Sequence, residues 1–379
     1  MKYLKEHLYL KERVYGHRKF LHQIAEIGRK EYKTSTYIRE QLDRMGVKYD
    51  KWLGTGTAGI IKGKNPKRTI AFRADIDGLT TENGIQHLCG HDGHTSILLG
   101  LTEFINDHRD RLNDNFVFIF QPAEEGPGGA EALIEEGVLK AYDVDLIYGL
   151  HVYPEIPEGK IGIREGYFMA QIGDFEIDIK GKCAHGANPE KGTDAIAVFS
   201  AFVNALQSIV SRNVSPLENA VLSIGKIEGG SRRNTIAESV HMEGTVRCFK
   251  PDIYAMLKRR IYEMADGFSK AYNCEIVVTI RDDYHPVNNN PEMTREFIEA
   301  VGKEKIVILD PLMISEDYSY YQEQVPGIFF MLGARNEEKG YVNGLHSLKF
   351  NFDEKIFMNA LNAYISMLEY KGALDKEEE

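Results

Sequence analysis

The hydrophobic pattern of the first part of the chain alternates between helical and strand-like spacing. Residues 1–45 predict two amphipathic helices, the second of which ends at Gly46. A further helix is predicted at 95–112, where the apolar residues lie on one helical face. Short β-rich runs bounded by turn residues occur at 69–77, 115–125 and 145–154. Strands that alternate with helices predict a mixed, largely parallel sheet with flanking helices, an α/β fold.

The pattern changes over residues 170–284. Alternating, strand-like segments lie at 174–181, 219–230, 239–249 and 274–284, and helical segments at 194–212 and 251–272. The resulting order β-α-β-β-α-β is that of the ferredoxin-like α+β arrangement, which folds as a unit of its own.

The remaining residues, 285–379, are too poor in strands to form a third domain. They contain a closing amphipathic helix at 358–372, and the last residues, 375–379, have the composition of a solvated tail. We therefore expect 285–379 to rejoin 1–169 in one α/β domain, with 170–284 inserted as a smaller second domain.

Composition narrows the class of protein. The chain of 379 residues carries 46 basic and 57 acidic side chains, a net charge of −11, and has no basic block. This balance argues against nucleic acid or an anionic membrane surface as a partner. Its four cysteines lie far apart, which is no disulfide framework, and the N-terminus has no signal-peptide core. The prediction is a cytoplasmic enzyme or small-molecule binder.

The segment HLCGHDGH, residues 87–94, gathers possible metal ligands within a few positions. Thiolate and imidazole are preferred ligands of zinc and similar ions, and the glycines allow the backbone to bend around an ion. Alone, however, the segment is also consistent with a buried cysteine and an ordinary helix start.

Acidic residues follow two of the predicted strands. Asp75 and Asp77 end the first run, and Glu124 and Glu125 end the second, in QPAEEG. Functional groups collect at the carboxyl ends of strands in such sheets. Adjacent side chains on extended backbone point to opposite sides, but a turn at Pro122 or Gly126 would redirect both carboxylates. One could then bind metal while the other acts as a general base, although an isolated Glu-Glu pair is more often two solvated acids.

Two solitary histidines, His151 in GLHV and His346 in NGLH, complete the candidate set. Neither histidine alone indicates a metal site, because a lone histidine is more often an ordinary core or surface residue. A joint set of thiolate, imidazole and carboxylate ligands suits Zn, Mn, Co or Ni better than Mg or Ca.

Taken together, CGHDGH, QPAEEGPGGA, GLHV, HGANPEKG, SRRNTIA, EGTVR and NGLH resemble the amidohydrolase branch of the M20 metallopeptidases. That branch includes N-acetyldiaminopimelate deacetylases, auxin-conjugate hydrolases and aminoacylase-like enzymes. The resemblance runs along essentially the whole chain. It implies a zinc-exopeptidase-like catalytic domain with two divalent metal ions, interrupted by a lid or dimerisation domain, and a homodimer or dimer of dimers.

The resemblance also implies roles for individual residues. Glu124 would be the general base, and Asp77 would orient a ligand, while Asp75 is left between support and structure. His94 would not be a ligand but would pack near the start of its helix. Cys89 would bridge the two ions, and the rest of the ligand set would be His91, Glu125, His151 and His346.

In the inserted domain, the resemblance implies that His185 reaches an active site across the dimer and stabilises the oxyanion. Asn234 and Arg247 would hold the substrate, with Arg247 pairing with its carboxylate. Without the matched motifs, a surface histidine, a turn asparagine and an edge-strand arginine would be the simpler interpretations.

The match departs from the family in two places. Only TTENGIQHL, residues 80–88, stands where the family usually has a longer loop that borders the substrate pocket, which leaves the acyl preference open. The proline that often follows the asparagine-containing motif is absent from NTIAES. The segment from Arg335 to Lys355 is especially similar to the deacetylases and favours a small N-acetyl substrate.

The leading prediction is a metal-dependent amidohydrolase that removes an acyl group, acetyl first of all, from an amino acid, with N-acetyl-diaminopimelate as one candidate. The alternatives are a dipeptidase or carboxypeptidase of the same family and a non-catalytic metal- or ligand-binding protein. A thiol redox protein using Cys89 ranks last, because no resolving cysteine is nearby.

Overall fold

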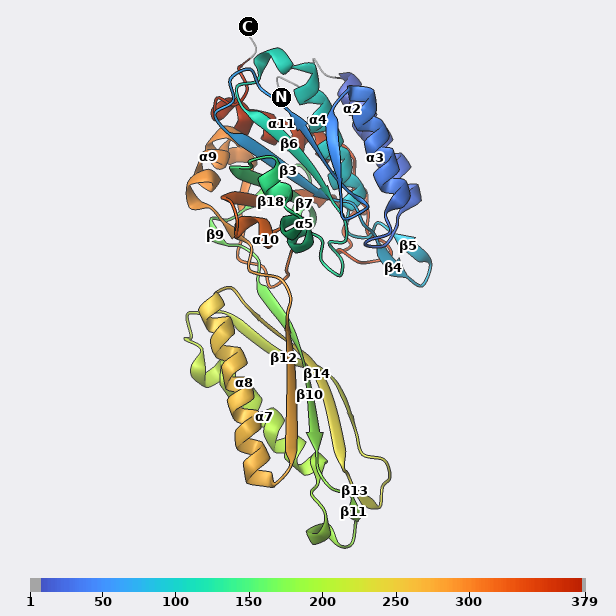
Figure 1. Ribbon diagram of the computed structural model, residues 1–379, viewed down its shortest axis with the longest axis vertical. Coiled ribbons are helices and arrows are strands. Elements are labelled where there is room, and N and C mark those ends of the chain that lie inside the picture. The colour runs from blue at the N-terminus through green and yellow to red at the C-terminus, as the bar shows by residue number, and fades with distance from the viewer. Residues whose placement is uncertain (1–7, 377–379) are drawn as a thin grey trace. The chain divides into compact units, whose positions relative to one another are not determined.

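The computed structural model describes residues 8–376 and divides the chain into two compact units (Figure 1). The first unit contains the chain up to Gly166 together with 288–310 and the segment from Asp317 onward. The second contains 167–287 and 311–316. The start of the first expected helix and the end of the expected solvated tail lie outside the described residues.

An eight-stranded sheet forms the centre of the first unit, in the order β1-β2-β6-β3-β7-β18-β8-β17. Its four central strands, β6, β3, β7 and β18, run parallel to one another. The pairs β1–β2, β2–β6 and β8–β18 are antiparallel, and β17 pairs with β8 in parallel. The strands span Lys48–Trp52 (β1), Gly56–Ile61 (β2), Thr69–Asp75 (β3), Asn115–Gln121 (β6), Leu146–Pro157 (β7), Ile161–Ile163 (β8), Ile306–Ile308 (β17) and Gly327–Arg335 (β18).

Burial on both faces explains why the sequences of the central strands are nearly continuous apolar runs. Every residue of β3 and all but the first of β6 are buried, as expected for parallel strands covered on both faces. Helices α4 and α11 pack against each other, with α4 on β3 and β7 and α11 on β18. The helices of this unit span Leu8–Leu21 (α2), Tyr32–Met45 (α3), His91–Asp107 (α4), Ala130–Glu136 (α5), Val138–Ala141 (α6), Pro291–Val301 (α9), Ser319–Gln322 (α10) and Ile356–Tyr370 (α11).

The structure confirms one sequence expectation and corrects another. Gly46 ends α3 in the left-handed conformation, with φ +66°, as predicted for a helix C-terminus. The helix expected at 95–112 instead begins at His91, directly after Gly90, whose φ of +93° turns the chain into the helix. The short segment 80–88 forms a hairpin from β4 (Leu79–Thr81) and β5 (Gly84–Gln86).

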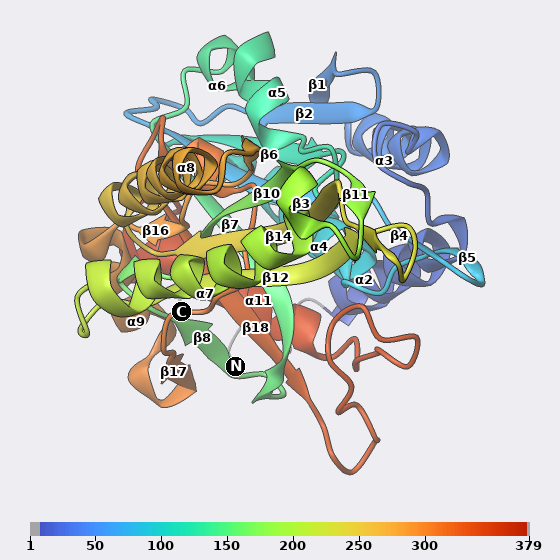
Figure 2. The same cartoon turned by 90° about the horizontal axis from the view of Figure 1, so that it is seen from below.

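The second unit has the predicted β-α-β-β-α-β order. Its antiparallel sheet runs β12-β14-β10-β15, and α7 and α8 lie side by side against it (Figures 1 and 2). The elements are β10 (Gln171–Lys180), α7 (Ala195–Asn213), β12 (Ala220–Gly229), β14 (Ser239–Cys248), α8 (Pro251–Tyr272) and β15 (Glu275–Asp282), with a small extra pair of β11 (Ala184–His185) and β13 (Thr235–Ile236).

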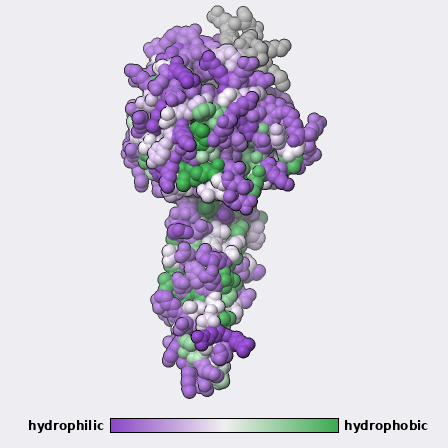
Figure 3. All heavy atoms as spheres, turned by 90° about the vertical axis from the view of Figure 1, so that its right-hand side faces the viewer, coloured by the Kyte–Doolittle hydropathy of each residue, from purple (hydrophilic) through white to green (hydrophobic). Residues whose placement is uncertain are grey.

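Helix α7 is long and apolar enough, by length and composition, to cross a membrane. Its buried residues, which include Val198, Phe202 and Leu206, pack in the core of the second unit with strand residues such as Ile177. Polar side chains dominate the face drawn in Figure 3, in keeping with the charged composition.

Candidate metal centre and active site

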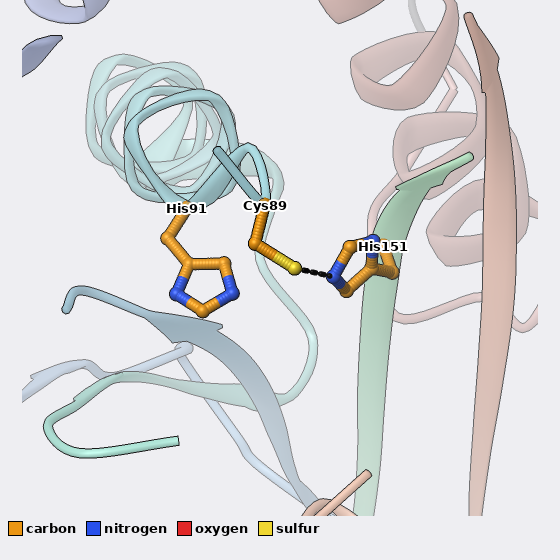
Figure 4. A group of neighbouring side chains, drawn as sticks. All are labelled: Cys89, His91 and His151. Carbon is orange, nitrogen blue, oxygen red and sulfur yellow. Dashed lines mark hydrogen bonds between the residues drawn. The ribbon is translucent and has the colours of Figure 1, made fainter. Parts of the chain in front are cut away.

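The candidate site lies where the segments after β3 and β6 meet the start of α4 and the middle of β7. Cys89 and His91 flank Gly90 at the beginning of α4, and His151 projects from β7 (Figure 4). The left-handed Gly90 places the thiol and the imidazole on the same side of the turn, as Figure 4 shows.

Cys89 lies at the centre of the expected ligands. Its Sγ is 3.3 Å from Nε2 of His151 and 3.3 Å from Nε2 of His346. The segment carrying His346 is tied to this loop, because the backbone amide of His346 donates to the carbonyl of Leu88 at 2.9 Å. His346 has φ +65°, an uncommon conformation for a non-glycine residue.

The backbone after β6 turns as the Glu-Glu segment requires. Ala123 has φ +59°, and its amide donates to the buried carboxylate of Glu31 at 2.9 Å. Glu31 was not a candidate in the sequence, because nothing in its local pattern connects it to QPAEEG. The turn brings Oε2 of Glu124 and Oε1 of Glu125 each to 3.9 Å from Nε2 of His91.

Five groups of side chains among the described residues could each hold a metal ion, and three of these groups overlap and consist only of the expected ligands and the expected base. Within each group, the potential ligand atoms lie within 4.8 Å of one another. The three overlapping groups are Cys89 with His91 and His151, Cys89 with Glu125 and His346, and His91 with Glu124 and Glu125. The structure thus brings all five expected ligands together with the expected base, and Cys89 belongs to two of the three groups.

Hydrogen bonds orient the imidazoles with one nitrogen facing the cluster. Nδ1 of His151 lies 2.7 Å from the carbonyl oxygen of Val152, and Nδ1 of His91 lies 3.0 Å from the carbonyl oxygen of Asp77. An N–H at each of these positions leaves the Nε2 lone pair free.

The carboxylate of Asp77 supports two of the expected ligands. Oδ1 lies 3.2 Å from Nδ1 of His91, and Oδ2 accepts the backbone amide of Glu125 at 3.0 Å. Asp77 therefore joins the start of α4 to the turn after β6.

Asp75 and His94 form a chain beneath the cluster. Nδ1 of His94 lies 2.6 Å from Asp75, and its Nε2 accepts the backbone amide of Val152 at 2.9 Å. His94 therefore does more than pack: it holds β7 next to His151. Although burial opposes the charge on Asp75, His91, His94 and Arg73 hold the pKa of its carboxyl well below its usual range.

The electrostatics of the cluster favour a cation. Burial and the carboxylates of Glu125 and Glu124 raise the pKa of the Cys89 thiol well above its usual value. Burial opposes charge on His91, yet Asp75 and Asp77 raise the pKa of its imidazole to about 10. Nε2 of His91 and Oε1 of Glu125 are buried without a hydrogen-bond partner among the described residues. Buried atoms of this kind call for an ion or another partner, so the donor set fits a divalent metal.

The three candidates in the second unit do not converge within that unit. His185 on β11 is exposed next to Asn234, whose carbonyl accepts the amide of Gly186 at 2.9 Å. Nδ1 of His185 accepts the amide of Ala187 at 3.1 Å, which leaves Nε2 to carry the proton. Arg247 lies near the far end of β14 and donates to the carbonyl of Met313 at 2.9 Å.

Comparison with known proteins identifies the family. The model of the peptidase family M20/M25/M40 matches residues 71–370. The chain belongs to this family. It is also 40% identical, over 94% of its length and 97% of the relative's, to an N-acetyldiaminopimelate deacetylase of Bacillus cytotoxicus.

Solved structures agree with this assignment. An aminohydrolase from methicillin-resistant Staphylococcus aureus has a TM-score of 0.89 and 33% identity, covering 95% of this chain and 96% of that one. The YxeP protein of Bacillus subtilis, a dinuclear metal-binding M20 peptidase, has a TM-score of 0.83 and 30% identity, covering 97% and 99%. The predicted family, the α/β fold class and the assignment as an amidohydrolase are confirmed.

Proposed function

We propose that this M20 amidohydrolase removes the acetyl group from N-acetyl amino acids that carry a free carboxylate, N-acetyl-diaminopimelate among them. The observation that carries the proposal is the convergence of His91, Glu125, His151 and His346 on Cys89, with Glu124 next to His91. The similarity to the Bacillus cytotoxicus deacetylase supports the choice of substrate.

In this proposal, the five ligands would hold two divalent ions of Zn, Mn, Co or Ni, and Cys89, whose Sγ lies 3.3 Å from Nε2 of both His151 and His346, would contribute to the binding of both. When bound, the ions would polarise the amide carbonyl and lower the pKa of water at the site. Asp77 would keep His91 and Glu125 oriented, since partners of this kind tune the affinity of metal ligands.

Glu124 would carry the proton transfers. Its carboxylate, 8% exposed and next to His91, would accept a proton from the attacking water and then donate it to the nitrogen of the departing amine. The products are acetate and the free amino acid.

The second unit would serve as lid and dimerisation domain. Arg247 lies at one end of β14, whereas His185 and Asn234 lie at the β11–β13 pair, which connects to the opposite ends of β10 and β14. One copy of this unit would therefore not present all three residues to the same small substrate. This separation supports a homodimer or dimer of dimers, in which His185 reaches the partner's site to stabilise the oxyanion while Arg247 binds the substrate carboxylate.

The test is turnover of a panel of N-acetyl amino acids, including N-acetyl-diaminopimelate, by the metal-loaded protein and its Glu124→Gln variant. We expect hydrolysis by the wild type and a loss of about 10²–10⁴-fold in kcat in the variant, because a positioned general base contributes about this much. Metal content, measured in parallel, should stay close to that of the wild type.

The matched control is Glu131→Gln, which makes the same change in the first turn of α5. It should retain wild-type activity. Faster turnover of dipeptides than of N-acetyl amino acids would indicate the alternative, a dipeptidase. Bound metal without turnover of either class would contradict the proposal and indicate a binding protein.

A further inference from the structure

The first unit contains a cavity of about 530 Å³ that includes none of the candidate active-site residues. Its walls come from α2, from the turn between β7 and β8, from the region after α9 and from α11. A volume of this size is typical of sites for small molecules.

The charged side chains around the cavity are predominantly basic. Four lysines line it, and the one acidic side chain of the wall is Glu158. The lysines are Lys11, Lys160, Lys305 and Lys355. This concentration of positive charge contrasts with the net charge of −11 of the whole chain.

Neighbouring groups neutralise part of this charge, but two ammonium groups have no carboxylate partner among the described residues, and one of these, Nζ of Lys11, lies 5.6 Å from the centre of the Tyr15 ring. Glu158 pairs with Lys355, and Lys160 donates to the carbonyl of Glu304 at 2.6 Å. Within residues 8–376, no ion pair joins Lys11 or Lys305 to a carboxylate. These two lysines approach the cavity from elements far apart in the sequence, α2 and the turn Lys303–Lys305.

The ring of Tyr15 also lines the cavity. The hydroxyl of Tyr15 is buried and has no hydrogen-bond partner among the described side chains and backbone. Burial, with Asp353 and Glu354, raises the pKa of Tyr15 to about 12, so the hydroxyl keeps its proton. These two acids are themselves paired, Asp353 with Lys339 and Glu354 with Arg18.

The facing helix α11 contributes two amides to the same wall. Asn359 and Asn362 are three residues apart and share a face of α11. In the part of the chain that the structure describes, neither side chain makes a hydrogen bond. Gly159, with φ +78°, allows the turn between β7 and β8 to pass close to Asn359, because a Cβ at position 159 would lie only 3.2 Å from Nδ2 of Asn359.

We propose that this cavity is a second ligand site, which binds a small organic anion through its phosphate or carboxylate oxygens. Lysine ammonium groups bind such oxygens as point charges, and the amides of Asn359 and Asn362 would complete the shell. The apolar part of the lining, including Val301 and Met358, would contact the carbon skeleton of the ligand.

The test is calorimetric titration of the metal-loaded protein with two probes, glycerol 3-phosphate and glutarate, at low ionic strength. We expect at least one of the probes to bind the wild type. Binding of one probe alone would identify phosphate or carboxylate as the preferred group. The double variant Lys11→Gln/Lys305→Gln should bind the preferred probe at least about tenfold more weakly, since it loses both unpaired cations.

The matched control is Lys19→Gln/Lys303→Gln. It makes the same charge change on the same two elements, but neither residue lines the cavity. Asn362→Leu keeps the charge and approximate size of the side chain and should weaken binding several-fold. All three variants should retain wild-type turnover, which shows that they are folded. Absence of binding to the wild type, or equal weakening in the double variant and its control, would overturn the proposal.

Discussion

Asp77 illustrates how a residue that is not itself an expected metal ligand can hold the expected ligands in position. Its two carboxylate oxygens contact His91 and the backbone of Glu125. Asp77→Ala should lower metal affinity by about 10–100-fold, because both expected ligands lose their support. Metal content after dialysis against buffered free zinc measures this, with Asp50→Ala on the exposed strand β1 as the control. Unchanged affinity would show that Asp77 is only structural.

Cys89 makes the proposed centre sensitive to oxidation. Peroxide should inactivate the enzyme and release metal, because oxidised sulfur does not bridge two ions as a thiolate does. The exposed Cys183 is also open to oxidation, so the Cys183→Ser variant should be inactivated to the same extent. Retained activity and metal content after peroxide treatment of this variant would argue against a thiolate bridge.

At the scale of elements, the packing of α2 makes stability depend on pH. His17 is 7% exposed, and its Nδ1 lies 2.8 Å from the hydroxyl of Tyr37 on α3. Burial, with the nearby Arg13 and Arg44, lowers the pKa of His17 from 6.5 to about 4. Between these values the unfolded chain binds a proton that the folded protein does not, so stability is lost as the pH falls from about 6.5 to 4.

The contribution of His17 is measurable as a difference between two proteins. A pKa that falls from 6.5 to about 4 corresponds to about 3 kcal/mol of the free energy of unfolding. Denaturant titrations of wild type and His17→Phe from pH 4 to pH 8 should therefore show a shallower acid loss in the variant. Parallel curves would mean that His17 is not responsible.

Elements were largely predictable from the sequence, because the spacing of apolar residues reports which faces are buried. The β-α-β-β-α-β order of the second unit and the end of α3 at Gly46 were found in this way. The start of α4 was predicted four residues late, since the polar first turn from His91 to His94 hides the helical pattern. That turn is polar because His91 and His94 lie in or beneath the candidate site, while Asp92 pairs with His22 and Arg18.

At the scale of the whole molecule, the proposed exchange of His185 between subunits predicts complementation. In a mixed dimer of Glu124→Ala and His185→Ala chains, one of the two sites would have both intact residues. Unfolding and refolding an equal mixture should restore about a quarter of wild-type activity. Each variant refolded alone serves as the control, and no recovery in the mixture would place His185 in its own subunit's site or outside catalysis.

The sequence by itself determined the family, the α/β class and the set of candidate ligands, because these depend on motifs and on local periodicity. The tertiary structure alone decided which side chains support that set. Glu31 contacts the turn at Ala123, and His94 contacts Val152 of β7, across separations of 92 and 58 residues. The cavity between Lys11 and Lys305 is likewise invisible in the chain order. Contacts of this kind arise when strands and helices pack, and no local pattern of polar and apolar residues encodes them.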